Sequence, residues 1–511
     1  MNRTLTRVIA LLTARPLTAA ALAGAVAVAG FAPLGVSPLA ILALTVLMLL
    51  WRHAPDPRRA AFIGFLFGVA FFGAGVSWVY VSLHTFGMMP APLAGLATAL
   101  FCAFLALFPA TVGYLQARLR AGPTTTLLLA VPALWTLSEW LRSVIFTGFP
   151  WLSLGYSQSD TTLTGFAPVL GVFGLSLIAA FCAGLLAMAM DGGRHARMAA
   201  TAGLVVVLVT GWALQEHAWT TPAGAPIRIA LAQGNVPQSM KFEAHRYAAT
   251  LETYRKLIAQ SNARLVVLPE TAVPRLLDQV DGRYLEDLQD LMQARGADLL
   301  LGAPLRDRSG RYYNSVVSLG VSHTQTYSKA HLVPFGEFIP PSFSWILSVL
   351  QIPLSDFSAG TANPLPMRLG DSLRVAVNIC YEDAFGAEII RQLPEATLLA
   401  NVSNVAWFGD SLAPEQHLQI SRLRAMETGR YMLRATNTGV TAIIDERGHV
   451  TAQLPQFTEG LLQGDAQPFG GATPFVRFGE TLVLLLCLAM GVAAGILSQI
   501  RARRDTPLSS H

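Results

Sequence analysis

Three residues on separate segments have side chains that together could supply a base, a cation and a nucleophile: Glu270, Lys329 and Cys380. A cysteine reacts as its thiolate, so it needs a nearby base that removes its proton. A glutamate can take that proton and return it later. An ammonium group can stabilise the oxyanion of a tetrahedral intermediate. Taken alone, these three residue types are a weak signal, because many proteins carry them on separate segments.

The surroundings of these residues make them more informative. Cys380, in VNICYED, is the only one of the four cysteines outside the apolar stretches, and it follows a β-rich run at 373–379. A strand end of an α/β domain is where a side chain can project into a site. Lys329 is one of only three lysines, and Glu270 ends the apolar run LVVLPE, where an ion must be paired or used. Each residue also has an alternative interpretation. Cys380 could be a buried inert cysteine, Lys329 a solvated surface lysine, and Glu270 a member of a structural salt bridge.

The segment 226–468 alternates strand and helix signals and must position these residues. Its β-rich runs are 227–231, 264–268, 298–301 and 373–379. Helical spacing occurs at 245–260, 284–294 and 415–431, and a hairpin is predicted from 440–444 and 449–454. We predict one α/β domain of about 240 residues, which is long enough to bury its own core.

The rest of the chain is strongly apolar. Hydrophobic residues make up 53% of the chain and charged residues 13%, about half the ~25% of soluble domains. This composition excludes a disordered chain, a disulfide-stapled small protein and an ordinary cytosolic enzyme. Stretches that approach the length of a membrane span are 16–32, 37–51, 60–82, 90–116, 125–141, 165–190, 198–215 and 481–500. The predicted domains are a seven-span membrane domain (1–215), a linker (216–225), a catalytic domain (226–468), and an eighth span with its tail (469–511).

Basic residues predict the topology of these spans. Residues 226–468 hold 21 Lys+Arg and 24 Asp+Glu, whereas the remainder holds 15 and 7. Arginines occupy the N-terminus, alternate connections and the C-terminus, and the intervening connections carry only Arg142. Because cationic loops stay in the cytoplasm, we expect both termini there and 216–480 on the far side, in the periplasm beside a bacterial inner membrane. The excess of basic residues therefore concerns topology and not nucleic acid. Residues 1–30 are interpreted as a retained span, with a cleaved signal peptide as the alternative.

At these residues the sequence resembles the nitrilase superfamily, whose hallmark is a Glu–Lys–Cys triad in this chain order. Within it, the sequence is similar to the membrane-embedded apolipoprotein N-acyltransferases over nearly its whole length. The motifs are LVVLPETAVP, YSKAHLVPFGEFIP, NICYEDAF, TGFPWLSLGYSQ, QGNVPQSMKF, NVSNVAWFGDS and RAMETGRYMLRATNTG. The resemblance implies a multi-span α-helical membrane domain of about eight helices plus a nitrilase-like αββα sandwich outside the cytoplasm.

The resemblance also implies a reaction. Cys380 would take an acyl chain from a phospholipid, expected to be phosphatidylethanolamine, as a thioester. The chain would then pass to the N-terminal amine of the diacylglyceryl-cysteine of an apolipoprotein. Glu270 would be the base and Lys329 the oxyanion stabiliser. Supporting or substrate-binding candidates are Glu337, Tyr381, Glu382, Trp151, Phe242, Trp345, Asn404 and Arg434. Phe242 stands where some members carry tryptophan. We expect a monomer. We also expect no metal or other cofactor, because no Walker loop, HExxH motif or paired Cys/His spacing is present.

Several interpretations stay open at this point. Residues 338–355 are uncharged and apolar, which favours a mobile lid that touches the bilayer over a core segment or a ninth span. Trp151 fits an interfacial aromatic belt or the lining of a lipid route. Residues 424–434 suit ion pairing along a helix or binding of a lipid phosphate. His331 and His417 are interpreted as structural. The functional alternatives are a membrane-tethered nitrilase-type amidase, a transporter and an inactive lipid-binding protein.

Overall fold

The computed structural model describes residues 3–241, 243–338 and 356–505, which form two compact units. The first unit comprises Met1–Ser77, Gly95–His217 and Phe478–His511, and the second comprises Trp78–Ala94 and Ala218–Arg477. The predictions for Phe242, for Trp345 and for a lid at 338–355 fall on residues that, apart from Phe338, lie outside the described ranges.

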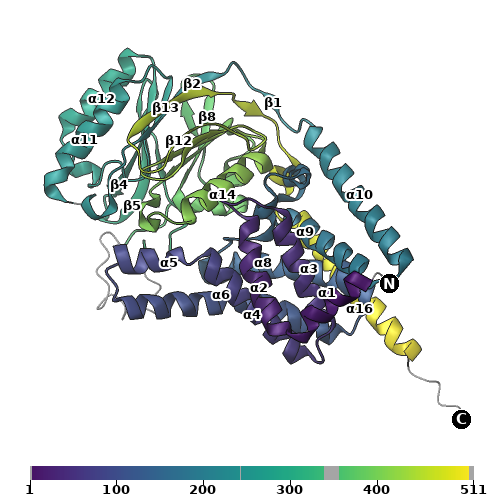
Figure 1. Ribbon diagram of the computed structural model, residues 1–511. Coiled ribbons are helices and arrows are strands. Elements are labelled where there is room, and N and C mark those ends of the chain that lie inside the picture. The colour runs from purple at the N-terminus through teal and green to yellow at the C-terminus, as the bar shows by residue number, and fades with distance from the viewer. Residues whose placement is uncertain (1–2, 242, 339–355, 506–511) are drawn as a thin grey trace, which may run out of the picture. The chain divides into compact units, whose positions relative to one another are not determined.

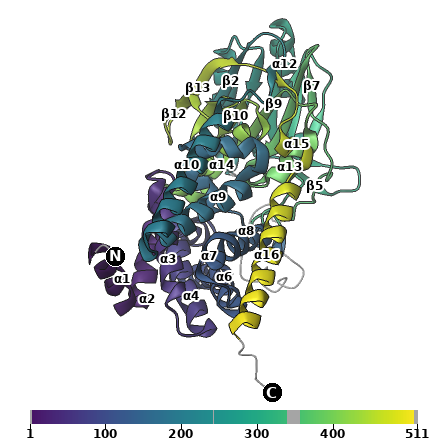
Figure 2. The same ribbon diagram turned by 90° about the vertical axis from the view of Figure 1, so that its right-hand side faces the viewer.

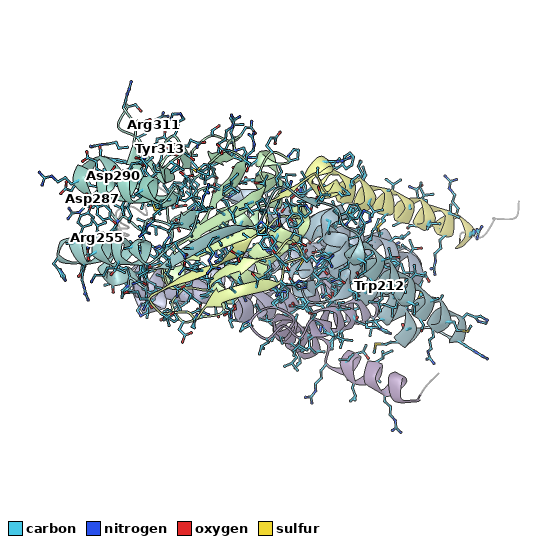
Figure 3. All side chains as sticks on the ribbon, turned by 90° about the horizontal axis from the view of Figure 1, so that it is seen from above. Trp212, Arg255, Asp287, Asp290, Arg311 and Tyr313 are labelled. Atoms are coloured by element: carbon cyan, nitrogen blue, oxygen red, sulfur yellow. The ribbon has the colours of Figure 1, made fainter. Side chains whose placement is uncertain are left out.

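The first unit is helical, as expected of long apolar runs, because a helix satisfies its backbone hydrogen bonds within itself. Its longer helices are α1 (Arg3–Ala14), α2 (Pro16–Ala27), α3 (Pro38–Arg52), α4 (Pro57–Gly75), α6 (Ala91–Leu119), α8 (Val131–Arg142), α9 (Ala167–Asp191), α10 (Arg194–Glu216) and α16 (Thr481–Asp505). Short turns between them are η1 (Val28–Gly30), α7 (Pro123–Thr125), η3 (Thr126–Ala130), η4 (Ile145–Thr147), η5 (Leu154–Gln158) and η6 (Thr162–Phe166). Trp212 lies on the exposed surface of α10 (Figure 3).

Among the described residues, five helices are long and apolar enough to cross a membrane: Pro57–Gly75, Ala91–Leu119, Thr162–Asp191, Arg194–Glu216 and Thr481–Arg504. The predicted count of about eight is therefore not confirmed. Two of the predicted spans are the shorter apolar helices Pro16–Gly30 and Pro38–Arg52, and a third is divided between η3 and α8. At 1.5 Å per residue, a 15-residue helix rises about 22 Å, less than the ~30 Å of a hydrocarbon core. The predicted span 60–82 also stops as a helix at Gly75.

The described residues of the second unit form two six-stranded sheets and a two-stranded ribbon. The first sheet has the order β13 (Gly460–Ala466), β2 (Ile227–Gln233), β3 (Leu265–Val267), β4 (Asp298–Arg306), β5 (Tyr312–Gly320), β6 (Thr326–Ser328). The second has the order β12 (Val450–Leu454), β11 (Thr441–Ile444), β10 (Met432–Thr436), β9 (Leu398–Ser403), β8 (Leu373–Ile379), β7 (Met367–Leu369). The ribbon pairs β1 (Thr221–Pro222) with β14 (Phe469–Gly470). At the centre of each sheet three strands are parallel, β2-β3-β4 and β8-β9-β10; Figure 2 shows β9 and β10 side by side.

Alternating side chains divide this unit into four layers. Leu231 and Val267 of the first sheet share one core with Val377 and Leu433 of the second, so the sheets pack face to face. The intervening residues of the first sheet, such as Val266, pack on α11 (Ala244–Ala259) and α12 (Gly282–Ala294), which cover its outer face (Figure 1). The outer face of the second sheet packs on α13 (Gly386–Ile389) and α14 (Ala413–Thr428). The predicted nitrilase-like αββα sandwich is therefore confirmed.

Of the helices of the sandwich, α11 and α12 are amphipathic, whereas α14 is buried along nearly its whole length. Arg255 on α11 and Asp287 and Asp290 on α12 are exposed and labelled at the edge of the second unit in Figure 3. The remaining short helices of this unit are α5 (Trp78–Val81), η2 (Ser82–Phe86), η7 (Gln238–Met240), η8 (Leu277–Gln279), η10 (Cys380–Ala384), η11 (Ile390–Gln392), η12 (Val405–Phe408) and α15 (Pro474–Phe478).

Residues 78–94 belong to the second unit although they lie far from it in the sequence. The Trp78 and Phe408 rings meet edge to face with centroids 4.7 Å apart. The Ser82 hydroxyl donates a hydrogen bond of 2.8 Å to the Trp407 carbonyl. These contacts tie α5 and η2 to η12, the turn that follows β9.

Candidate active site

Cys380 occupies a strained turn at the carboxyl end of β8. It is the first residue of η10, and its φ of +55° lies in the left-handed region that residues other than glycine rarely adopt. Its carbonyl accepts a hydrogen bond of 3.1 Å from Asn401 Nδ2, and His417 Nε2 lies 3.2 Å from the same oxygen. The turn is therefore held through its backbone, while the cysteine remains partly exposed.

Glu270 follows β3 and presents a fixed carboxylate. Its Oε1 accepts a hydrogen bond of 2.7 Å from Asn314 Nδ2, and its Oε2 accepts one of 2.7 Å from the backbone N–H of Asn404. The predicted supporting residue Asn404 thus contacts Glu270 directly. Because both oxygens have a donor, the carboxylate is oriented before any substrate arrives.

Lys329 follows β6 and is buried, with 1% of its side chain exposed. Its Nζ lies 2.7 Å from Glu337 Oε2 and 4.0 Å from Glu270 Oε1. Burial alone would lower the pKa of this ammonium, but the carboxylates of Glu337 and Glu270 raise it well above its usual value. Lys329 therefore stays protonated. Asn314 Nδ2 also donates to Glu337 Oε1 at 2.8 Å, so one amide bridges the two carboxylates.

The electrostatic environment keeps the Cys380 thiol protonated at rest. Burial raises its pKa most, Glu270 raises it further, and Lys329 opposes both effects. The three residues predicted as a triad are thus brought close enough to influence one another. Since the resting nucleophile is a thiol, a base must remove its proton as it reacts.

Glu382 braces the nucleophile turn. One of its carboxylate oxygens accepts hydrogen bonds of 2.7 Å from the Tyr327 hydroxyl and from the Ile379 N–H. The other accepts from the N–H groups of Ala330 and His331, at 2.7 and 3.1 Å. This buried carboxylate therefore joins the turn that carries the cysteine to the segment that carries Lys329.

Tyr381 and the two histidines have aromatic or ionic neighbours. The Tyr381 ring packs edge to face on Phe385, with centroids 5.1 Å apart. His331 Nδ1 lies 3.1 Å from Glu388, and His417 Nε2 lies 2.7 Å from Asp383. Both histidines are hydrogen-bonded, as predicted, and their structural role stays a prediction.

Arg434 does not face a lipid. Its side chain is wholly buried on β10, where Nη1 donates to Asn401 Oδ1 at 2.8 Å and lies 3.3 Å from Asp383 Oδ2. The interpretation of residues 424–434 as a lipid-phosphate site is therefore wrong for Arg434. Its contacts with Asn401 and Asp383 instead support the turn that carries Cys380. Arg424 pairs with Glu427 at 2.9 Å, also fully buried, so ion pairing along the helix is confirmed for this pair alone.

Trp151 lies in the first unit and is 1% exposed. Its carbonyl accepts a hydrogen bond of 2.6 Å from Arg142 Nη1, and its ring stacks on Phe149 with centroids 6.3 Å apart. The aromatic-belt interpretation is wrong, because a belt residue faces the membrane surface. The buried arginine holds the loop that turns Trp151 inwards.

Two residues of the site, Asn314 and Lys241, were not predicted. Asn314 lies within β5, a strand that was not predicted either, so no local pattern marked this residue. Lys241 is one of three lysines and belongs to the QGNVPQSMKF motif. Its Nζ donates a hydrogen bond of 3.2 Å to the backbone carbonyl of Glu270.

A face-to-face αββα sandwich with a thiol, an ammonium and a carboxylate beside its parallel strands is the architecture of carbon–nitrogen hydrolases. Residues 228–471 match the family model described as carbon-nitrogen hydrolase. Residues 23–185 match the model of the apolipoprotein N-acyltransferase N-terminal domain. The chain belongs to the apolipoprotein N-acyltransferase family.

Relatives support this assignment over most of the chain. The apolipoprotein N-acyltransferase of Nitrosomonas europaea is 52% identical, with 90% of this chain and 93% of the relative covered. That of Methylococcus capsulatus is 46% identical, with 91% and 92% covered. Among solved structures, the NitFhit protein of C. elegans aligns with a TM-score of 0.39 and 18% identity, covering 56% of this chain and 67% of that one.

Proposed function

We propose that this enzyme transfers an acyl chain from a phospholipid, through a thioester on Cys380, to the N-terminal amine of diacylglyceryl-cysteine on apolipoproteins. This is the final step of lipoprotein maturation. The observation that carries the proposal is that a chain related to apolipoprotein N-acyltransferases over nine-tenths of its length gathers Glu270, Lys329 and Cys380 at one site.

The first half-reaction forms the thioester. Glu270 takes the proton from Sγ of Cys380, and the sulfur attacks the carbonyl carbon of the acyl ester. The negative charge that develops on the carbonyl oxygen is stabilised by the Lys329 ammonium. The C–O bond to the glycerol breaks as the tetrahedral intermediate collapses. Glu270 then gives its proton to the departing oxygen, so lysophospholipid leaves as an alcohol.

The second half-reaction transfers the acyl chain. The neutral α-amine attacks the thioester carbonyl, and Glu270 takes a proton from the nitrogen. The C–S bond then breaks, and the proton returns to sulfur, so an amide and the free thiol result. The step is downhill, because an amide is more stable than a thioester.

We assign Glu337 to holding Lys329 in place, at a separation of 2.7 Å. Because Lys329 is buried and paired, its ammonium is fixed before charge develops on the substrate. The chain's own side chains thus supply the base and the cation of both half-reactions and the nucleophile of the first.

We infer that phosphatidylethanolamine is the donor and that the enzyme works as a monomer in a bacterial inner membrane. We also infer cytoplasmic termini and a periplasmic catalytic domain at 226–468. The five apolar helices support a membrane location, and the alternating arginines support this orientation.

Mass spectrometry of the purified full-length protein tests the reaction. After incubation with phosphatidylethanolamine in mixed micelles, an acyl adduct should appear on Cys380 and be discharged by a diacylglyceryl peptide. Cys380→Ala should abolish the adduct, whereas Cys102→Ala, in the first unit, should leave it unchanged. Discharge by water at the same rate without the peptide would favour the amidase-type hydrolase, and an adduct that survives in Cys380→Ala would refute the proposal.

A further inference from the structure

Lys241 is a buried lysine beside the site. It is 3% exposed and donates a 3.2 Å hydrogen bond to the backbone carbonyl of Glu270. Within the described ranges, Lys241 forms no ion pair at or below 4.0 Å. Lys329, by contrast, lies 2.7 Å from Glu337. A buried ammonium is costly unless something compensates its charge, which makes this one unusual.

The charges of the site show what Lys241 can compensate. Glu270 and Glu337, the two carboxylates within 4.0 Å of Lys329 Nζ, carry two negative charges, against the one positive charge of Lys329. The excess negative charge persists when the proton moves from Cys380 to Glu270, because the charge then resides on sulfur. A second cation is therefore needed to balance the buried site in each of these states.

We propose that Lys241 is a positioning residue for the reaction, which holds the Glu270 backbone and supplies the second positive charge that balances the site. This inference rests on the proposed function and adds a residue to it. Lys241 acts through Glu270 and does not touch the reacting atoms. Loss of its charge disfavours the thiolate of Cys380 and slows both half-reactions.

A distinct pH dependence follows. Burial lowers the pKa of Lys241 to about 8, and the charged or titratable groups that act on it, Glu270 and Cys380, oppose this shift. The group is charged below that value and neutral above it. Activity should therefore fall as the pH rises through about 8, although a thiol alone would become more reactive as the pH rises.

The experiment compares Lys241→Met and Lys241→Arg with Lys256→Met in the full-length enzyme. Lys256 is a matched control, because it lies on α11 with 67% of its side chain exposed. We expect kcat/KM at pH 7 to fall on the order of 10²-fold in Lys241→Met, comparable with the loss of one stabilising donor. The fall of kcat/KM as the pH rises through about 8 should disappear in this variant. Lys241→Arg should retain activity and move this fall upwards by more than one pH unit, because an arginine keeps its charge.

A second measurement needs no acyl substrate. The rate at which iodoacetamide alkylates Cys380 at pH 7, followed by mass spectrometry of its peptide, should fall in Lys241→Met and stay unchanged in Lys256→Met. Unchanged alkylation together with an unchanged pH profile in Lys241→Met would overturn the inference, even if acyl transfer itself is established. If acyl transfer is absent from the wild type, the proposed function fails, while the alkylation rate still tests Lys241.

Discussion

Replacement of Asn314 by alanine should disable the site without unfolding the enzyme. The Asn314 amide donates to Glu270 at 2.7 Å and to Glu337 at 2.8 Å. It is the contact that links the proposed base to the carboxylate that holds Lys329. In its absence the two carboxylates lose a common donor, and nothing else on β5 replaces the amide.

The expected size of the effect follows from the two bonds. A hydrogen bond to a charged group contributes about 1.5–3 kcal/mol, so the two together contribute roughly 3–6 kcal/mol. At about 1.4 kcal/mol per factor of ten, full expression of that energy in the transition state would lower kcat/KM by ~10²–10⁴-fold. Water can enter the vacated space and restore part of the hydrogen bonding, so we expect about 10²-fold.

The assay measures transfer of a fluorescent acyl chain from phosphatidylethanolamine to a diacylglyceryl peptide, with the melting temperature recorded in the same detergent. Asn262→Ala is the matched control, because Asn262 is exposed. The reasoning would be refuted if Asn314→Ala retained kcat/KM within twofold of the wild type. It would equally be refuted if activity and folding were lost together and neither returned in Asn314→Gln, which keeps the amide.

Three further predictions concern the surroundings of the nucleophile. Glu382→Ala should lower the free energy of unfolding by at least ~3 kcal/mol, because four hydrogen-bond donors lose their acceptor. Chemical denaturation measures this change, and a change below ~1 kcal/mol would contradict the bracing role. Burial raises the pKa of Asp383, but His417 and Arg434 lower it on balance, so its contribution to stability is present above about pH 4 and is lost as the pH falls through the folded pKa. Asp383→Asn should therefore show a smaller drop in melting temperature than the wild type between pH 5 and pH 2, and equal drops would count against this role. Glu270→Gln should speed alkylation of Cys380 by iodoacetamide at pH 8, because one cause of the raised thiol pKa is removed. Acyl transfer should fall by ~10²-fold or more in the same variant, because its base is lost. Slower alkylation would show that the carboxylate assists thiolate formation in that reaction too.

The apolar strands were predictable from the sequence. The run 373–379 coincides with β8, and 264–268 contains β3, because both are buried and rich in β-branched residues. The helix predicted at 415–431 ends earlier, at Thr428, since Gly429 adopts φ +62° and closes it.

Other strands were missed because polar side chains obscure their pattern. β5 buries Asn314 together with two serines, and β10 buries Arg434. These residues belong to hydrogen-bond networks that form only when distant segments of the chain come together. The local spacing of residues in the sequence therefore does not predict them. For the same reason the motifs indicated Glu270, Lys329 and Cys380, whereas Asn314, which bridges the carboxylates of Glu270 and Glu337, became visible only in the folded unit.

The packing of residues 78–94 on η12 has a practical consequence for dissecting the enzyme. A gene fragment that begins near residue 218 would encode every strand that the structure describes in the sandwich, yet it would omit the peptide that contacts Trp407 and Phe408. A soluble truncation would therefore expose two aromatic rings and lose the support of the turn beside Asn404. Supplying 78–94 as a separate synthetic peptide, or fusing it through a linker, is the way to obtain this half of the molecule intact.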